Sequence, residues 1–320
     1  MNIVIEDLKT NGWSVVADVL TPQEVHEYTN VFWEDFEQVL GRKRNDPELT
    51  RTACWISTLH GIIEHYGIGH SRFMWKVRCN QKVQRIFRGL WGITEQERLI
   101  TSFNGCCIIR PIEGSRRAHF NPKRTWLHTD QTPNTTNNHN MPSPFWSHGV
   151  KAIQGSVNLM DSDEDDACFY VLTGSHRYHA RFFRAHANEF KKPTRDFFIM
   201  KPQHIAWFEQ RGCQRLAITV RAGDMTLWDS RLVHCGKLAD EHRSNPQRWR
   251  LTAFVCMMPR KLVQQKVLTR RQIIAANART TCHWPNQPRV FPKKPRENRI
   301  GEIPYKEFKP YTDENTIQLI

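Results

Sequence analysis

His128 and Asp130 lie two positions apart, and their side chains are of types that bind metal ions. In an extended backbone both would point to one face, because side chains alternate across a strand. His234, far along the chain, follows a second β-like run and can supply a third ligand. Two histidines and one carboxylate on a β scaffold form the facial arrangement that holds non-haem Fe(II) with open coordination positions.

The His-x-Asp pattern is weak when taken alone. The chain has 15 histidines, so one such pattern is expected roughly once by chance. His128 is, however, the only histidine with an acidic residue two positions later. It also follows a β-like run and precedes the polar segment 133–148, which we expect to be a long loop at a cavity mouth, able to contact substrate.

A second group of polar residues follows His234. Arg248, Arg250 and Thr252 alternate along a strand expected at 250–256, so their side chains should share a face. An arginine there can bind a carboxylate through two hydrogen bonds in a low-dielectric pocket. A cosubstrate with a 2-oxo acid end for the metal and a second carboxylate for the arginine would be 2-oxoglutarate.

These motifs resemble the phytanoyl-CoA dioxygenase-like family of Fe(II)/2-oxoglutarate oxygenases over residues 10–258. The resemblance rests on short motifs in order: Gly12-Trp13, Thr21-Pro22-Gln23-Glu24, His128-x-Asp130, Gly174-Ser175-His176, and Gly223-Asp224 through His234 to Arg250. It implies a double-stranded β-helix (jelly-roll, cupin-like) fold. It also implies a hydroxylase that uses Fe(II), 2-oxoglutarate and O2 and releases succinate and CO2.

The resemblance assigns roles to individual residues. His128, Asp130 and His234 are the implied catalytic metal ligands, and Arg250 is the implied partner of the 2-oxoglutarate carboxylate. Thr252 and Ser156 are placed in the same cosubstrate pocket. Because Asp130 is present, the halogenating variants of the family, which need that position vacated for a halide, are disfavoured.

Two features depart from the family pattern. The gap from His234 to Arg250 is longer than usual, so Arg248 stays an alternative carboxylate ligand. The strand before the acidic turn carries Gln154, Ser156 and Asn158, which predicts a more polar pocket. Three residues are candidates for contact with the substrate: Gln131, Gln154 and Asn158.

The remaining pattern predicts a mainly β protein with helical decoration (α+β). Helices are expected at 21–41, with a capping box, and at 80–91. Strands are expected at 12–16, 106–109, 151–159, 168–172, 225–228 and 250–256, with an insertion of helix and loop at 185–215. The chain divides into an oxygenase domain, 1–258, and a basic, proline-punctuated C-terminal extension, 259–320, helical to about residue 280 and packed on the same domain.

Net charge is the main indication of the substrate. The 46 Lys and Arg outnumber the 32 Asp and Glu, giving a formal charge of +14. Such an excess favours an anionic partner, either a small molecule or a nucleotide or nucleic acid. A metal-free jelly-roll module that binds nucleic acid is therefore the alternative function. A zinc hydrolase is a third possibility, but it gives no role to a buried arginine.

Composition bounds the cellular setting. Nine cysteines without a C-x-x-C pair indicate reduced thiols in an intracellular, soluble protein, cytoplasmic or nuclear. No apolar run is long enough to span a membrane. The acidic stretch 161–166 lacks the pattern of a calcium loop and is interpreted as a solvated turn. The other histidines singled out are interpreted as structural, polar or loop residues: His60, His65, His70, His139, His148, His176 and His179.

Overall fold

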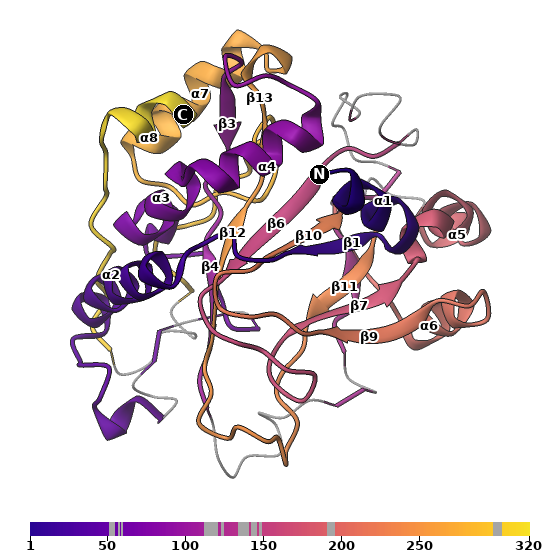
Figure 1. The fold of residues 1–320 in the computed structure, drawn as a ribbon, viewed down its shortest axis with the longest axis horizontal. Coiled ribbons are helices and arrows are strands. Elements are labelled where there is room, and N and C mark those ends of the chain that lie inside the picture. The colour runs from indigo at the N-terminus through magenta and orange to yellow at the C-terminus, as the bar shows by residue number, and fades with distance from the viewer. Residues whose placement is uncertain are drawn as a thin grey trace.

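The strands pair into two antiparallel sheets at the centre of the computed structural model (Figure 1). The structure describes residues 1–50, 55–56, 58, 60–111, 121–122, 125–133, 141, 146, 149–190, 196–296 and 303–320. Most of the predicted loop 133–148, with His139 and His148, lies outside these residues, as does Cys54. The eight cysteines in the described part are free thiols.

The larger sheet has six strands. Its order is β1 (Trp13–Val16), β10 (Met225–Asp229), β6 (Ile153–Asn158), β12 (Arg250–Val255), β4 (Cys106–Ile109) and β2 (Ile62–Ile63). The smaller sheet runs β8 (Phe198–Ile199), β5 (His128–Thr129), β11 (Val233–Gly236), β7 (Phe169–Thr173) and β9 (Gln214–Ile218). A separate pair joins β3 (Leu99–Thr101) to β13 (Met257–Pro259).

Side chains from both sheets meet in the space between them. Phe169 and Val171 of β7 pack with Trp228 of β10 and Phe254 of β12. Two facing antiparallel sheets built from strands far apart in the sequence form the predicted double-stranded β-helix. The predicted fold class is confirmed.

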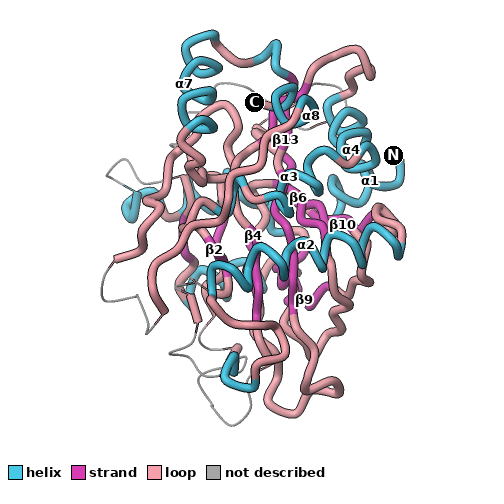
Figure 2. Tube along the Cα trace, turned by 90° about the vertical axis from the view of Figure 1, so that its left-hand side faces the viewer, coloured by secondary structure: helices cyan, strands magenta, loops and turns pink. Residues whose placement is uncertain are grey.

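Helices cover the outer face of the larger sheet. They are α1 (Asn2–Asn11), α2 (Pro22–Leu40), α3 (Arg72–Cys79) and α4 (Gln81–Trp91), and Figure 2 shows α2 lying across the strands. Helix α2 begins as predicted: Thr21 accepts a hydrogen bond from the Glu24 amide while the Glu24 side chain accepts from the Thr21 amide. The apolar faces of these four helices pack against the outer side chains of β6, β10 and β12 and form one core with them. This packing fixes the sheet that carries Gln154 and Arg250.

The smaller sheet is covered by α5 (His179–Ala185) and α6 (Pro202–Glu209). Here the sequence prediction was incomplete, because residues 185–215 were expected to hold only helix and loop. The segment also contains β8 and the start of β9, whose exposed side chains lack the alternation that marks a half-buried strand. The helix α1, before the predicted first strand, was likewise not anticipated.

The extension beyond residue 258 returns to the β core. It contains α7 (Gln265–Ala276), as predicted, and α8 (Glu314–Leu319), both beside β3 at the top of Figure 1. The guanidinium of Arg271 is fully buried and donates hydrogen bonds to the carbonyls of Thr101, Pro285 and Leu319. One side chain therefore ties the extension to the core. The division at residue 258 stays a prediction.

Among the described residues, no helix has both the length and the apolar character needed to cross a membrane.

Candidate metal centre

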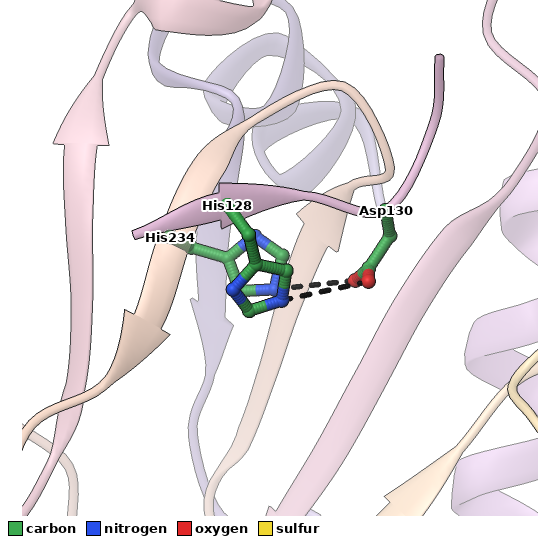
Figure 3. A group of neighbouring side chains, drawn as sticks. All are labelled: His128, Asp130 and His234. Atoms are coloured by element: carbon green, nitrogen blue, oxygen red, sulfur yellow. Dashed lines mark ion pairs between the residues drawn. The ribbon is translucent and has the colours of Figure 1, made fainter. Parts of the chain in front are cut away.

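The two histidines of the predicted triad are cross-strand partners. His128 on β5 lies directly opposite His234 on β11, and Asp130 follows at the end of β5. The Nε2 atom of His128 lies 3.5 Å from Asp130 Oδ1, and that of His234 lies 3.3 Å from Oδ2 (Figure 3). The candidate ligand atoms all lie within 4.8 Å of one another. The fold thus brings together residues from two distant parts of the chain.

Hydrogen bonds to the backbone fix the protonation of both imidazoles. His128 Nδ1 lies 3.1 Å from the Trp126 carbonyl, and His234 Nδ1 lies 2.9 Å from the Leu232 carbonyl. A carbonyl can only accept, so each neutral ring carries its proton on Nδ1 and directs the Nε2 lone pair at Asp130. Three electron-pair donors then converge with no proton between them, which is an arrangement that a bound cation satisfies.

Asp130 is ionised and held in place. Burial opposes its ionisation, but the electrostatic influence of the nearby His283 and His128 imidazoles outweighs burial, so its pKa lies well below the ordinary value. Gln154 Nε2 donates a 2.7 Å hydrogen bond to Asp130 Oδ2. Burial, together with the neighbouring His128 imidazole, lowers the pKa of His234, which keeps that ring neutral. A carboxylate and neutral imidazoles are the ligand forms that metals need.

The triad opens onto a cavity of about 320 Å³. Trp126 stacks on His128 with centroids 4.6 Å apart, while Phe169 and Trp228 lie 5.3 and 5.4 Å from the His234 ring. Further aromatic residues line the cavity: Phe197, Phe254, Trp284 and Phe291. The walls are thus more aromatic than the sequence predicted, because only Gln154 of the three polar residues on β6 reaches the lining.

Arg250 lines this cavity and Arg248 does not. The Arg250 guanidinium is buried and donates to the Cys168 carbonyl at 2.9 Å. Arg248 precedes β12, so the strand alternation does not extend to it; its guanidinium pairs with Asp163 and Asp166 at 2.6 and 2.5 Å. The acidic turn predicted to be solvated therefore holds this arginine away from the metal centre.

Three polar residues assigned to the pocket lie deeper in the barrel, outside the cavity lining. Thr252 Oγ1 donates to Asn158 Oδ1 at 2.7 Å, and Asn158 Nδ2 donates to Thr226 Oγ1. Ser156 is buried on the same face of β6 as Gln154, two residues away. These side chains fill the barrel interior, so their predicted contacts with cosubstrate or substrate would need a ligand that reaches past the lining.

Gln131 is also turned away from the cavity. Its Oε1 accepts a 2.7 Å hydrogen bond from Ser230, and its Nε2 donates to the Gly149 carbonyl at 2.8 Å. The backbone carbonyl of Gln131 accepts a hydrogen bond from His179 Nε2. The sequence predicted that His179 lies in a loop, but His179 begins α5 and is buried. His176 is likewise buried, with Nε2 2.9 Å from the Lys9 carbonyl. Gln131 and His179 are thus hydrogen-bonded just past the end of β5, whereas His176 binds to helix α1.

Sequence reasoning missed part of the cavity wall. His60, expected to be an ordinary polar histidine, stacks on Trp126 at 4.2 Å and lines the cavity. Asp196 and His283 line it as well, although they lie in segments without a recognisable motif. His60, Asp196 and His283 sit in irregular backbone, where no strand or helix period marks the side that faces inward, so no sequence signal was available.

A jelly roll with a two-histidine, one-carboxylate centre and a buried arginine facing the same cavity defines a non-haem, metal-dependent oxygenase. The family model for phytanoyl-CoA dioxygenase (PhyH) matches residues 8–238. The chain belongs to this family. It is therefore an oxidoreductase of the class that uses Fe(II) and 2-oxoglutarate, as the motifs predicted.

Similarity to individual proteins is low in sequence identity. "Ava biosynthesis cluster protein O" of Aspergillus versicolor is 25% identical over 293 residues, which cover 88% of this chain and 85% of that protein. The solved epimerase SnoN with Fe3+, alpha-ketoglutarate and nogalamycin RO has 18% identity and a TM-score of 0.48, covering 81% and 83% of the two chains. EctD from S. alaskensis with 2-oxoglutarate and 5-hydroxyectoine has 14% identity and a TM-score of 0.47, covering 82% and 77%.

Proposed function

We propose that this chain hydroxylates a small organic molecule with Fe(II) at His128, Asp130 and His234, converting 2-oxoglutarate and O2 to succinate and CO2. The observation that carries the proposal is the convergence of two Nε2 lone pairs and an ionised carboxylate on one point, at the wall of a cavity that also contains the Arg250 guanidinium.

The protein's residues have two roles: some position the ion and the cosubstrate, and others exclude water. Bound iron supplies the activation of O2 coupled to decarboxylation of 2-oxoglutarate. His128, Asp130 and His234 would hold the ion at the cavity wall, where the cosubstrate and the substrate could reach it from the cavity. Arg250 offers its guanidinium to the distal carboxylate of the cosubstrate. Gln154 holds the Asp130 carboxylate, and the rings of Trp126 and Trp228 keep water from the centre.

The cavity favours a neutral, partly aromatic substrate over the anionic one predicted from net charge. Part of the basic charge is structural, since Arg78, Arg110 and Arg271 are buried. Beyond the triad the charged lining residues are balanced: Arg250 and Arg289 against Glu64 and Asp196. With Arg250 assigned to the cosubstrate, little positive charge is left for an anion or a nucleic acid.

The fungal relative supports a role in small-molecule metabolism. Its name assigns that protein to a biosynthesis cluster, and its similarity extends over most of both chains. We infer that the substrate here is also a biosynthetic intermediate and that the reaction is an oxidative modification of it. The alternative of a metal-free nucleic-acid-binding module has no observation in its favour among the described residues.

Binding and turnover test the proposal directly. Under anaerobic conditions the purified chain should bind one Fe(II) and then one 2-oxoglutarate, producing the visible absorption band of the chelate. On admission of O2 it should form succinate slowly even without substrate. His128→Ala should remove all three signals, whereas exposed His26→Phe should retain them. A chain that binds neither iron nor 2-oxoglutarate would contradict the proposal and favour a binding module.

A further inference from the structure

A short strand brings an acidic side chain to the metal centre. In β8, Ile199 pairs with His128 in antiparallel register, so the residues just before β8 lie beside the end of β5, where Asp130 is. Phe197 packs edge-on against the His128 ring, with centroids 5.6 Å apart. Asp196 directly precedes Phe197 and lines the same cavity as the triad.

The Asp196 carboxylate is open to the cavity. The residue is only partly buried, and neither of its oxygens belongs to the buried polar atoms that lack a partner. Since the residue also lines the cavity, a bound compound can reach these oxygens. Asp196 differs in this respect from Trp228 and Trp284, whose indole nitrogens are covered by protein.

The protein supplies no hydrogen-bond donor to this carboxylate within the described residues. Burial raises the pKa of Asp196, the charge of Arg289 opposes that rise and the charge of Asp130 adds to it, and no hydrogen bond contributes. The Arg289 guanidinium lies over the Phe291 ring, 5.6 Å from its centroid, and forms no ion pair with Asp196 in the described part of the chain. A partly buried carboxylate without a donor loses hydration that nothing in the protein replaces. A donor on a bound compound would replace it.

The surface around the carboxylate is aromatic. Phe197 is its neighbour in the chain, and the cavity lining also includes Trp126, Phe254 and Phe291. Such rings bind a flat, apolar skeleton by burying its area and by edge or face contacts. An ionised carboxylate accepts hydrogen bonds from O–H or N–H groups and repels another anion. A ring compound that carries a hydroxyl or an N–H group fits both features.

We propose that Asp196 is a specificity-determining residue of this enzyme and selects a ring compound with a hydroxyl or N–H group, which donates a hydrogen bond to the Asp196 carboxylate. The inference rests on the proposed function, because it holds this compound beside the iron centre. It adds to the neutral, partly aromatic substrate a polar group by which the cavity can orient it.

The test uses the anaerobic complex of the full chain with Fe(II) and 2-oxoglutarate, titrated by calorimetry near neutral pH with two matched pairs of neutral ring compounds. In each pair methylation removes the donor: 2-methoxynaphthalene is compared with 2-naphthol, and 1-methylindole with indole. We expect the wild type to bind the donor of at least one pair about tenfold more tightly than its methylated partner, as for a hydrogen bond to a charged group. The pair with the larger ratio distinguishes a hydroxyl from an N–H group.

Variants show whether the ratio depends on the carboxylate. Asp196→Ala should bring the ratio close to unity, and Asp196→Asn should keep part of it, because an amide oxygen still accepts but carries no charge. Glu241→Ala is the matched control: Glu241 is exposed and lies outside the cavity lining, so its removal should leave the wild-type ratio.

Three results would overturn the inference: equal affinities within both pairs for the wild type, an unchanged ratio in Asp196→Ala, or no binding of any of the four compounds. Failure of the proposed function looks different, because the wild-type chain would then bind neither Fe(II) nor 2-oxoglutarate.

Discussion

Two clusters among the described residues each combine two histidines with one carboxylate, at similar dimensions. His128, Asp130 and His234 form one; His186, Glu189 and His204 form the other, and in each the candidate ligand atoms lie within 4.8 Å of one another. Only the first has the chemistry of a metal site. His186 Nδ1 faces a carbonyl, that of Phe182, as the triad histidines do, so the difference lies in the hydrogen bond made by the second nitrogen of His204.

In the first cluster both Nδ1 atoms face carbonyls, so both Nε2 atoms carry lone pairs toward the carboxylate. In the second, the Lys201 amide donates to His204 Nδ1 at 3.2 Å. The neutral His204 ring must then carry its proton on Nε2, which donates to Glu189 at 3.1 Å. A metal ion could bind there only by displacing that proton, whereas the triad has no proton to displace.

The surroundings add to this difference. Asp130 is buried at the wall of a cavity, while the Glu189 side chain is 29% exposed and already pairs with Lys201 at 2.5 Å. The second cluster links His204 of α6 to Glu189 and His186, and its side chains already have hydrogen-bond partners in the protein. Proximity of ligand-type residues is therefore a weak criterion for a metal site, and the histidine tautomer imposed by the backbone is a strong one.

The largest expected effect separates the clusters by metal content. His234→Ala should abolish Fe(II) binding, because two remaining ligands cannot hold the ion at the triad, while His204→Ala should keep one Fe(II) per chain. Anaerobic titration followed by metal analysis measures both. A wild-type stoichiometry of two, reduced to one by His204→Ala, would contradict the tautomer argument.

Arg250 tests whether the first cluster is completed by a cosubstrate site. Arg250→Ala should weaken 2-oxoglutarate binding by about 2–5 kcal/mol, roughly the value for loss of one partner of a buried charge pair. Iron binding should persist. Arg248→Ala is the control, because Arg248 pairs with the acidic turn. If Arg248→Ala shows the loss and Arg250→Ala does not, the assignment of the cavity arginine is wrong.

Gln154 tests how much the first cluster depends on support for its carboxylate. Gln154→Ala removes the 2.7 Å hydrogen bond to Asp130 and should lower Fe(II) affinity about 10–100-fold. Gln131→Ala, which changes a buried amide outside the cavity lining, should lower the thermal midpoint with a smaller change in affinity. Equal affinities for the two variants would show that Asp130 needs no such support.

The smallest effect concerns stability at the second cluster. Hydrogen bonds from Lys201 and His204 lower the pKa of Glu189 to about 2. Its stabilising effect should be full above the unfolded-state pKa of about 4.3 and disappear as the pH falls toward 2. Glu189→Gln should reduce the free energy of unfolding by about 1 kcal/mol near pH 6, with no difference near pH 2, measured by urea denaturation. A difference independent of pH would exclude the charge as its cause.

Local sequence patterns were sufficient for several of the elements and, through the family resemblance that they support, for the reaction class. The capping box at Thr21, the alternation of Arg250 and Thr252 along β12, and the His-x-Asp pattern each depend on neighbours within a few positions. Such short-range regularities are imposed by helix and strand geometry. They led to the jelly roll, to the triad and to Arg250 as a candidate.

The tertiary structure decided which candidates share a cavity. The sequence favours Arg250 and leaves Arg248 as an alternative, and only the pairing of Arg248 with Asp163 and Asp166 removes it from the metal centre. Segment 280–291, which carries His283 and Trp284, has no recognisable motif. Its place beside the triad depends on contacts such as the hydrogen bond from Arg271 to the Pro285 carbonyl. The sequence by itself determined the chemistry, because metal ligands must be of particular residue types; which residues meet the substrate was determined by long-range packing.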